Sequence, residues 1–333
     1  MKTGVCISVD TEFSVGGAFG DPDRRKPVGK ESVWCNSGNK SEGLGFILEA
    51  LSEYNLKATF FVEALNTIYF DSAEMGNIAY QLFKEEQDVQ LHIHPCWAYF
   101  ANANWKSELK HNPPNDNIDK RDLGEMIRLI RYGVDEFIKW GIPRPIAVRT
   151  GNLDVNADLY LALRQCGIEY SSNIGVGVNV PDNNKLNLFN GIHNISGVTE
   201  IPVFTYYDLK LPGYSHMKCF TIIGCSLGEM TFLLEKIHAE NYGPLMILTH
   251  PSEFAHITED YSEIKPNITV QKRFRELCRY LSENNERFEV TTFAHSQNTW
   301  KENINKSQGK TLVLPVLKTI KKLIQKKLSM EPV

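Results

Sequence analysis

The sequence predicts an α/β fold in which parallel strands alternate with helices, and two observations support this. Short apolar runs, such as Gly4–Val9 and Gly243–Thr249, alternate with longer segments whose apolar residues recur at helical spacing. The chain has 333 residues, 42% of them hydrophobic. A barrel of parallel strands with its helices takes about 250 residues, so one catalytic domain with additional segments fits this length.

Each element is expected where its own period occurs, because strands alternate every two residues and helices bring every third or fourth residue to one face. The expected strands are residues 4–9, 57–63, 88–94, 145–148, 200–203, 219–223, 243–249 and 288–293. The expected helices are residues 41–55, 72–86, 119–140, 155–166, 227–241 and 271–284. Residues 13–40 and 96–118 show no such period and are expected to be insertions, which at this length are usually functional.

Ionisable or amide side chains close four of the expected strands. These side chains are Asp10 and Glu12, His92 and His94, Arg149 and Asn152, and His250. Active sites of parallel sheets collect at the carboxyl ends of the strands, so we expect these residues to lie together. Two carboxylates, three imidazoles, an arginine and an amide are the residue types of a metal-assisted hydrolase.

The strand-like segment Leu91–Pro95 contains two histidines two residues apart. In a strand, His92 and His94 point to the same side, with Cα atoms roughly 6–7 Å apart. Two imidazoles so placed can bind a first-row metal ion, above all zinc. Each cluster also has a structural interpretation: hydrogen-bonded histidines at a sheet edge, Asp10 as a helix cap, and Arg149 in a surface ion pair.

Five segments, in this order, resemble the motifs of one known family. They are Ser8–Glu12, Ala58–Val62, Leu91–Pro95, Arg149–Asn152 and Leu248–Pro251. Over residues 1–295 the chain is similar to the polysaccharide deacetylases of the NodB type, carbohydrate esterase family 4. The resemblance implies a distorted, TIM-barrel-like (β/α) barrel of about seven parallel strands.

Three features depart from the common pattern of that family. Thr11 stands where the family has a second aspartate, and the two histidines are two residues apart instead of four. The segment Arg149–Asn152 lacks the usual proline and aromatic residue. With these departures the chain resembles a divergent branch found in surface-polysaccharide biosynthesis, including the O-antigen of lipopolysaccharide.

The resemblance implies a metal-dependent hydrolase that removes an N-acyl group, acetyl or formyl, from an amino sugar. It implies that Glu12, His92 and His94 are the metal ligands, with open positions for water and the acyl oxygen. The metal is expected to be zinc, although iron, cobalt and nickel suit the same ligands.

For the catalytic groups, the resemblance implies that Asp10 is the general base and His250 the general acid. Arg149 would hold Asp10 in a charge-assisted pair. The reverse assignment, with Asp10 as ligand and Glu12 as base, stays open, because both side chains share a face.

Three residues are candidates for binding the sugar. Asn152 follows the arginine, Trp97 belongs to the insertion at 96–118, and Trp34 belongs to the insertion at 13–40. Aromatic rings and amides suit the faces and hydroxyls of sugars, but aromatic residues in a loop can equally anchor it to the core.

Composition narrows the partners and the compartment. The net charge of −4 gives no support for nucleic-acid binding. Seven cysteines without a CxxC pair indicate reduced thiols in the cytoplasm, and neither a secretory signal nor a membrane-spanning run is visible. The amino sugar is therefore expected to be a nucleotide-linked or lipid-linked precursor.

The C-terminal region differs in composition from the rest. Residues 296–309 are polar and are expected to form a linker, followed by a basic amphipathic tail over 310–333. Residues 310–328 carry six lysines and no acidic residue. Such a segment can lie on the inner membrane surface, and the alternative is a helix docked on the barrel.

Two other functions compete with amino-sugar deacylation. A relative with the same fold and metal could hydrolyse a small ureide or cyclic amide. The missing second aspartate and the altered histidine spacing motivate the other alternative, a catalytically inactive carbohydrate-binding protein.

Overall fold

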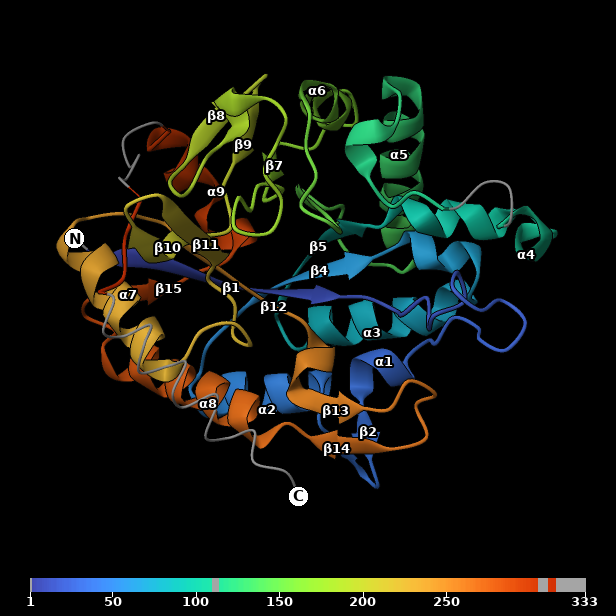
Figure 1. Cartoon of the computed structure of the whole chain (residues 1–333), viewed down its shortest axis with the longest axis horizontal. Coiled ribbons are helices and arrows are strands. Elements are labelled where there is room, and N and C mark those ends of the chain that lie inside the picture. The colour runs from blue at the N-terminus through green and yellow to red at the C-terminus, as the bar shows by residue number, and fades with distance from the viewer. Residues whose placement is uncertain (1, 110–113, 305–310, 316–333) are drawn as a thin grey trace.

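A computed structural model describes the whole chain except residues 1, 110–113, 305–310 and 316–333. A curled, mostly parallel sheet runs through the molecule, and helices pack against its outer face (Figure 1). The α/β fold class expected from the sequence is confirmed.

Within the described part of the chain, the main sheet has nine strands, in the order β12-β1-β4-β5-β6-β7-β9-β8, with β15 also paired to β1. Their bounds are β1 Thr3–Thr11, β4 Thr59–Glu63, β5 Asp88–Ile93, β6 Ala147–Thr150, β7 Tyr170–Ser171, β8 His193–Ile195, β9 Val198–Glu200, β12 Leu245–Thr249 and β15 Phe288–Val290. Three small hairpins lie outside it: β2 Asn36–Ser37 with β3 Lys40–Ser41, β10 Thr205–Leu211 with β11 Tyr214–Cys219, and β13 Ala255–Ile257 with β14 Ile264–Pro266.

The α-helices follow the strands along the chain. They are α1 Glu31–Trp34, α2 Leu44–Glu53, α3 Ser72–Lys84, α4 Trp105–Glu108, α5 Leu123–Lys139, α6 Ala157–Gln165, α7 Leu227–Ala239, α8 Ile268–Glu283 and α9 Phe293–Glu302. Most begin with a side-chain cap, as Asp122 does for α5 by accepting from the Glu125 amide, and such caps stabilise a helix start.

The sheet forms a curled, mostly parallel half-barrel, where a distorted barrel of about seven parallel strands was expected. The strands from β12 to β9 pair in parallel, but β8 pairs antiparallel to β9 and ends the sheet there. An irregular segment crosses the gap between the edges. In it, the Val203 amide donates to Ile174 O (2.8 Å) and the Phe204 amide donates to Met246 O (3.0 Å).

Successive side chains of a strand point to opposite faces of the sheet, and two apolar clusters lie on these two faces. In β1, Val5, Ile7 and Val9 face the outer cluster under the helices, whereas Cys6 belongs to the inner cluster. Ser8 and Asp10 have the parity of Cys6 and so face the inside of the curl. Side chains alternate in the same way along β4, β5 and β6. The last inward positions of these strands carry the polar residues at the carboxyl edge of the sheet.

The C-terminal region differs from the expectation in its first part. Residues 296–302 belong to α9 and not to a linker, because Phe293 and Trp300 enter the inner cluster against Tyr170. After the gap at 305–310, Leu312 is buried along β10, where its carbonyl accepts from the Tyr207 amide (2.8 Å). The remainder of the expected basic segment, from residue 316 on, lies outside the described residues.

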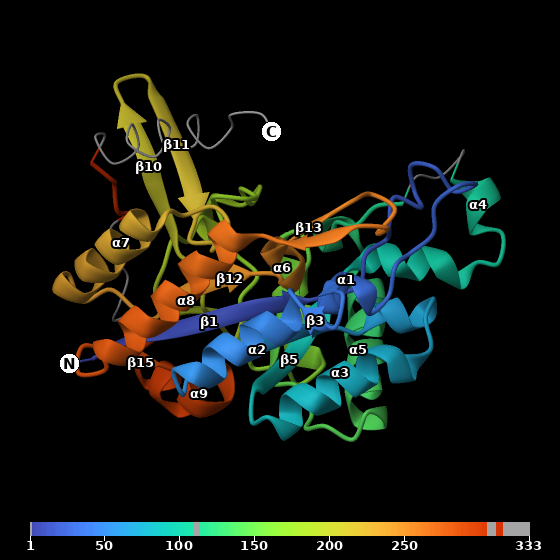
Figure 2. The same ribbon diagram turned by 90° about the horizontal axis from the view of Figure 1, so that it is seen from below.

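Two expected strands also change position. The strand expected at 200–203 overlaps β9 only at Glu200, and the one expected at 219–223 overlaps β11 only at Cys219. Strands β10 and β11 form a hairpin that projects from the body beside α7 (Figure 2). Among the described residues, no helix has both the length and the hydropathy that are needed to cross a membrane.

Candidate metal-binding active site

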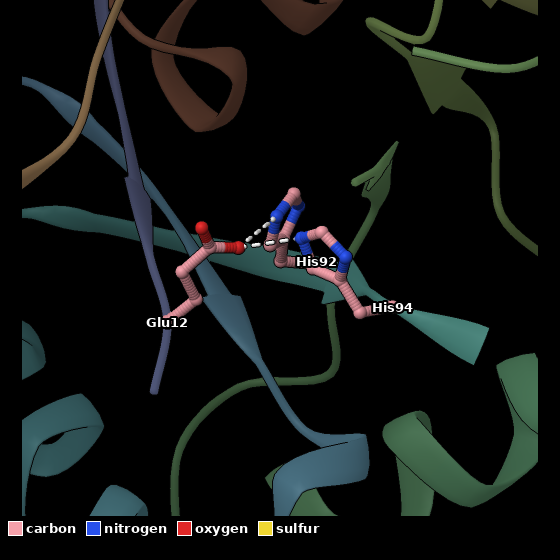
Figure 3. A group of neighbouring side chains, drawn as sticks. All are labelled: Glu12, His92 and His94. Atoms are coloured by element: carbon pink, nitrogen blue, oxygen red, sulfur yellow. Dashed lines mark hydrogen bonds and ion pairs between the residues drawn. The ribbon is translucent and has the colours of Figure 1, made fainter. Parts of the chain in front are cut away.

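Glu12, His92 and His94 meet at the carboxyl edge of the sheet. Glu12 Oε2 lies 3.0 Å from His92 Nε2 and 2.6 Å from His94 Nε2 (Figure 3). The two imidazole rings are nearly perpendicular, with centroids 4.9 Å apart. All three ligand atoms lie within 4.8 Å of one another, so one ion could contact all of them.

The second nitrogen of each imidazole is already used, which leaves Nε2 for a metal. His92 Nδ1 lies 3.0 Å from the Arg149 carbonyl and His94 Nδ1 lies 2.6 Å from Asp116 Oδ2. The Arg149 carbonyl and an ionised Asp116 carboxylate can only accept hydrogen bonds, so each Nδ1 carries a proton. This is the arrangement of metal-binding histidines, and two imidazoles with one carboxylate suit zinc. The residues therefore fit a divalent ion.

Two carboxylates, Glu12 and Asp116, flank His94 and favour the charged form of its imidazole. Burial lowers the pKa of His94, but Glu12 and Asp116 outweigh burial and raise it well above its usual range. Burial raises the pKa of Glu12, and the two imidazoles outweigh it and hold this pKa well below its usual range. A bound cation would take the place of the proton on Nε2 between these groups.

Asp10 lies beside this trio and is held by a buried arginine. Arg149 Nη1 donates to Asp10 Oδ1 and to Ser8 Oγ, both at 2.8 Å. Its other nitrogens donate to the Ser172 carbonyl (3.0 Å) and Oγ (2.7 Å), and the Phe61 ring lies 4.3 Å from the guanidinium carbon. Arg149 is fully buried and Asp10 nearly so, so the pair orients Asp10 firmly.

His250 faces Asp10 across the site. Its Nε2 lies 3.9 Å from Asp10 Oδ2, while Nδ1 lies 2.9 Å from Glu253 Oε1. Burial lowers the pKa of His250, but Glu253, Asp10 and Glu12 outweigh it and raise the pKa to about 9. His250 is therefore protonated at neutral pH, as a proton donor must be.

A cleft of about 260 Å³ opens over Glu12 and His94. Both insertions line it, the first through residues such as Ser14 and Ser32 and the second through Cys96, Trp97 and Asp116. The binding pockets of drug-sized ligands measure about 300–1,000 Å³, so this cleft accepts a group the size of one sugar ring.

The three expected sugar-binding residues occupy different places. Asn152 reaches the site, with its Nδ2 3.4 Å from Asp116 Oδ2. Trp97 touches the cleft but is almost wholly buried against Phe70 and Phe100, so it mainly anchors the insertion. Trp34 lines another hollow, beside α3, and not this cleft.

Sequence reasoning missed four residues that hold the site together. Glu63 accepts from the backbone amides of Leu65 and His94, and burial raises its pKa well above the usual range. Asp116, Ser172 and Glu253 are the others, through the contacts given above. Glu63 and Glu253 each stand within three residues of a motif, a signal that could have been followed.

Comparisons with known proteins support the fold. No family model matches the sequence, and no curated protein matches it. A protein from Mycobacterium smegmatis described as a polysaccharide deacetylase aligns with a TM-score of 0.52 at 11% identity, over 94% of each chain. The 4-alpha-glucanotransferase of Thermococcus litoralis aligns with a TM-score of 0.51 at 13% identity, over 99% of this chain and 47% of that one.

A family 4 carbohydrate esterase from Streptomyces lividans also matches, with a TM-score of 0.43 at 11% identity, over 87% of this chain and 93% of that one. Polysaccharide deacetylases of carbohydrate esterase family 4 are thus among the structural matches. Because a deacetylase and a glucanotransferase match equally well, the fold leaves the reaction open, and only the residues of the site can indicate it.

Proposed function

We propose that this protein is a metal-dependent hydrolase that removes an N-acyl group, acetyl or formyl, from an amino sugar during surface-polysaccharide biosynthesis. One observation carries the proposal: Asp10 and His250 face each other beside the Glu12, His92 and His94 trio. A base, an acid and a set of metal ligands close to one another are what amide hydrolysis requires.

The residues of this chain divide the proton transfers between them. A bound divalent ion would polarise the acyl oxygen and make water a stronger nucleophile. Asp10, oriented by Arg149, takes a proton from the attacking water. His250 gives its Nε2 proton to the leaving amine, and Glu253 holds the imidazole through Nδ1.

Glycosyl transfer, the activity named for the glucanotransferase, fits these carboxylates poorly. That chemistry uses a carboxylic acid of raised pKa next to a second carboxylate. Here Glu12 contacts two imidazoles and Asp10 is paired with Arg149. The carboxyl group of Glu63, whose pKa is raised, is buried and accepts from two backbone amides, so it is not presented to a substrate. Hydrolysis of a small cyclic amide would use the same residues and stays the second candidate, because the cleft is small.

The first test is the metal content of protein purified without added metal or chelator. We expect near-stoichiometric metal in the wild type and none in the His92→Ala/His94→Ala variant. The matched control is His256→Ala/His295→Ala, which removes two exposed histidines that belong to neither candidate group of metal ligands and should keep the metal.

The second test is product release by the metal-loaded protein. N-acetyl and N-formyl amino sugars, nucleotide-linked and lipid-linked, are compared with small cyclic amides, and released acetate or formate is measured. Release from a sugar supports the proposal, whereas turnover of the cyclic amides alone would favour the second candidate. If metal is absent from the wild type and is not restored by zinc or cobalt, the hydrolase proposal fails and a carbohydrate-binding role replaces it.

A further inference from the structure

The imidazole of His94 lies directly against the backbone of Gly151. A β-carbon built at position 151 would come closer than 3.0 Å to three ring atoms of His94: Cε1, Nδ1 and Nε2. Real β-carbons essentially never approach other atoms so closely. While His94 keeps this orientation, glycine is therefore the only residue that position 151 accepts.

Neither partner can easily move aside. The backbone amide of His94 donates to Glu63, its Nδ1 lies 2.6 Å from Asp116 Oδ2, and its Nε2 lies 2.6 Å from Glu12 Oε2. The Gly151 amide donates to Ile93 O (2.9 Å), which extends the pairing of β5 and β6. A methyl group at position 151 would have to break one of these interactions.

We infer that Gly151 is a positioning residue that sets the orientation of the metal ligand His94. The inference rests on the proposed metal site. It joins two features that the sequence presents separately, the two-residue spacing of the histidines and the glycine within Arg149–Asn152. The ring of His94, two residues after His92, fits here because position 151 has no side chain in the space that the ring occupies.

The expected consequence is a loss of metal affinity. In Gly151→Ala the ring turns away, so His94 Nε2 no longer converges with Glu12 and His92. Removing a partner that orients a ligand typically weakens metal binding by about 10- to 100-fold, and we expect a loss of this size.

The test compares Gly151→Ala with Gly228→Ala by measuring zinc affinity in competition with a chromogenic chelator. Gly228 lies in α7, where an added β-carbon meets nothing within 4 Å. Gly228→Ala should bind zinc like the wild type, and Gly151→Ala should bind it at least about tenfold more weakly. Unchanged zinc affinity in Gly151→Ala overturns the inference alone, whereas a wild type that binds no zinc overturns the proposed function together with it.

A double-mutant cycle separates positioning from general damage to the fold. In the metal-free protein, Gly151→Ala should lower the midpoint of thermal unfolding, because the methyl group clashes with the ring. In the His94→Ala background the clash is gone, so the same substitution should cost nothing. An equal loss in both backgrounds would mean that the backbone, and not His94, requires the glycine, and would overturn the inference.

Discussion

Asp10 and His94 lie at the same edge of the sheet, but different kinds of structure hold them. The partner of Asp10 is Arg149 in β6, which is bound in turn by Ser8 in β1 and Ser172 just after β7. The side-chain partner of His94 Nδ1 is Asp116, which belongs to the insertion at 96–118. Sheet residues therefore orient the base, and an inserted loop orients the metal ligand.

This difference predicts separate consequences for stability and for binding. Arg149 is fully buried, and a charge in the interior needs its partner. Asp116 lies at the rim of the cleft, and its side chain is 25% exposed. Changes on the Asp10 side should therefore affect catalysis and folding, and changes on the His94 side should affect metal affinity.

The largest effect is expected for Asp10→Asn, which keeps the shape of the side chain and removes the base. Hydrolysis should fall by about 10²–10⁴-fold, the usual contribution of general base catalysis. Metal content should equal that of the wild type, because Asp10 bonds Arg149 and not the imidazoles of His92 and His94. The measurements are kcat and bound metal per chain.

The matched variant is Glu12→Gln, which should lose metal first and activity as a consequence. If instead Asp10→Asn loses the metal while Glu12→Gln keeps it, the roles are exchanged. Glu12 would then be the base and Asp10 the ligand, the assignment that the sequence leaves open.

Arg149→Met tests the Asp10 side through stability. It leaves Asp10 in the interior without its cationic partner, and breaking a buried pair in this way costs about 3–5 kcal/mol. Arg275→Met is the control, because Arg275 pairs with Glu49 at the surface, where pairs contribute about 0–1 kcal/mol. Urea unfolding of both metal-free variants measures the difference, and an equal cost would show that Asp10 does not need Arg149 to fold.

Asp116→Asn tests the other side. The amide holds His94 less strongly, so metal affinity should fall by about 10- to 100-fold. The free energy of unfolding should change little, since Asp116 lies on a peripheral insertion. Asp182→Asn, at a carboxylate 91% exposed, serves as the control in the same metal titration. A large loss of stability with unchanged affinity would erase the distinction between the two sides.

The parts of this site that could be predicted are those that strand alternation determines. Five of its residues lie at or just after the carboxyl ends of strands, so parity and the common edge bring them together without knowledge of any loop: Asp10, Glu12, His92, His94 and Arg149. The α/β fold follows in the same way from the periods of the apolar residues.

What could not be predicted depends on how irregular segments fold. Asp116 and Ser172 belong to no periodic pattern that would connect them to His94 and Arg149. Trp34 belongs to an insertion that lines the cleft, but its own side chain lines a different hollow. The sheet stays a half-barrel because no strand of the described residues fills the gap between its edges. An irregular segment makes the hydrogen bonds there instead. Such segments are positioned by tertiary contacts, which local patterns do not encode.

The smallest effect is expected for Glu253→Gln, which removes the negative charge beside His250, the proposed acid. The Glu253 carboxylate raises the pKa of His250 toward its value of about 9, so removing the charge lowers that pKa. His250 must be protonated to act as the acid, and activity should therefore decline at a lower pH than in the wild type, where it declines near pH 9. The exposed Glu289→Gln should leave the pH profile unchanged.

The same substitution should alter the pH dependence of stability, and the sign follows from the direction of the shift. A histidine whose pKa is raised by folding stabilises the folded state below its usual pKa, and this contribution disappears as the pH rises through the folded value of about 9. In Glu253→Gln the contribution should be smaller and should disappear at lower pH. If the basic limb of activity stays near pH 9 in this variant, His250 is not the proton donor, and another group must protonate the leaving amine.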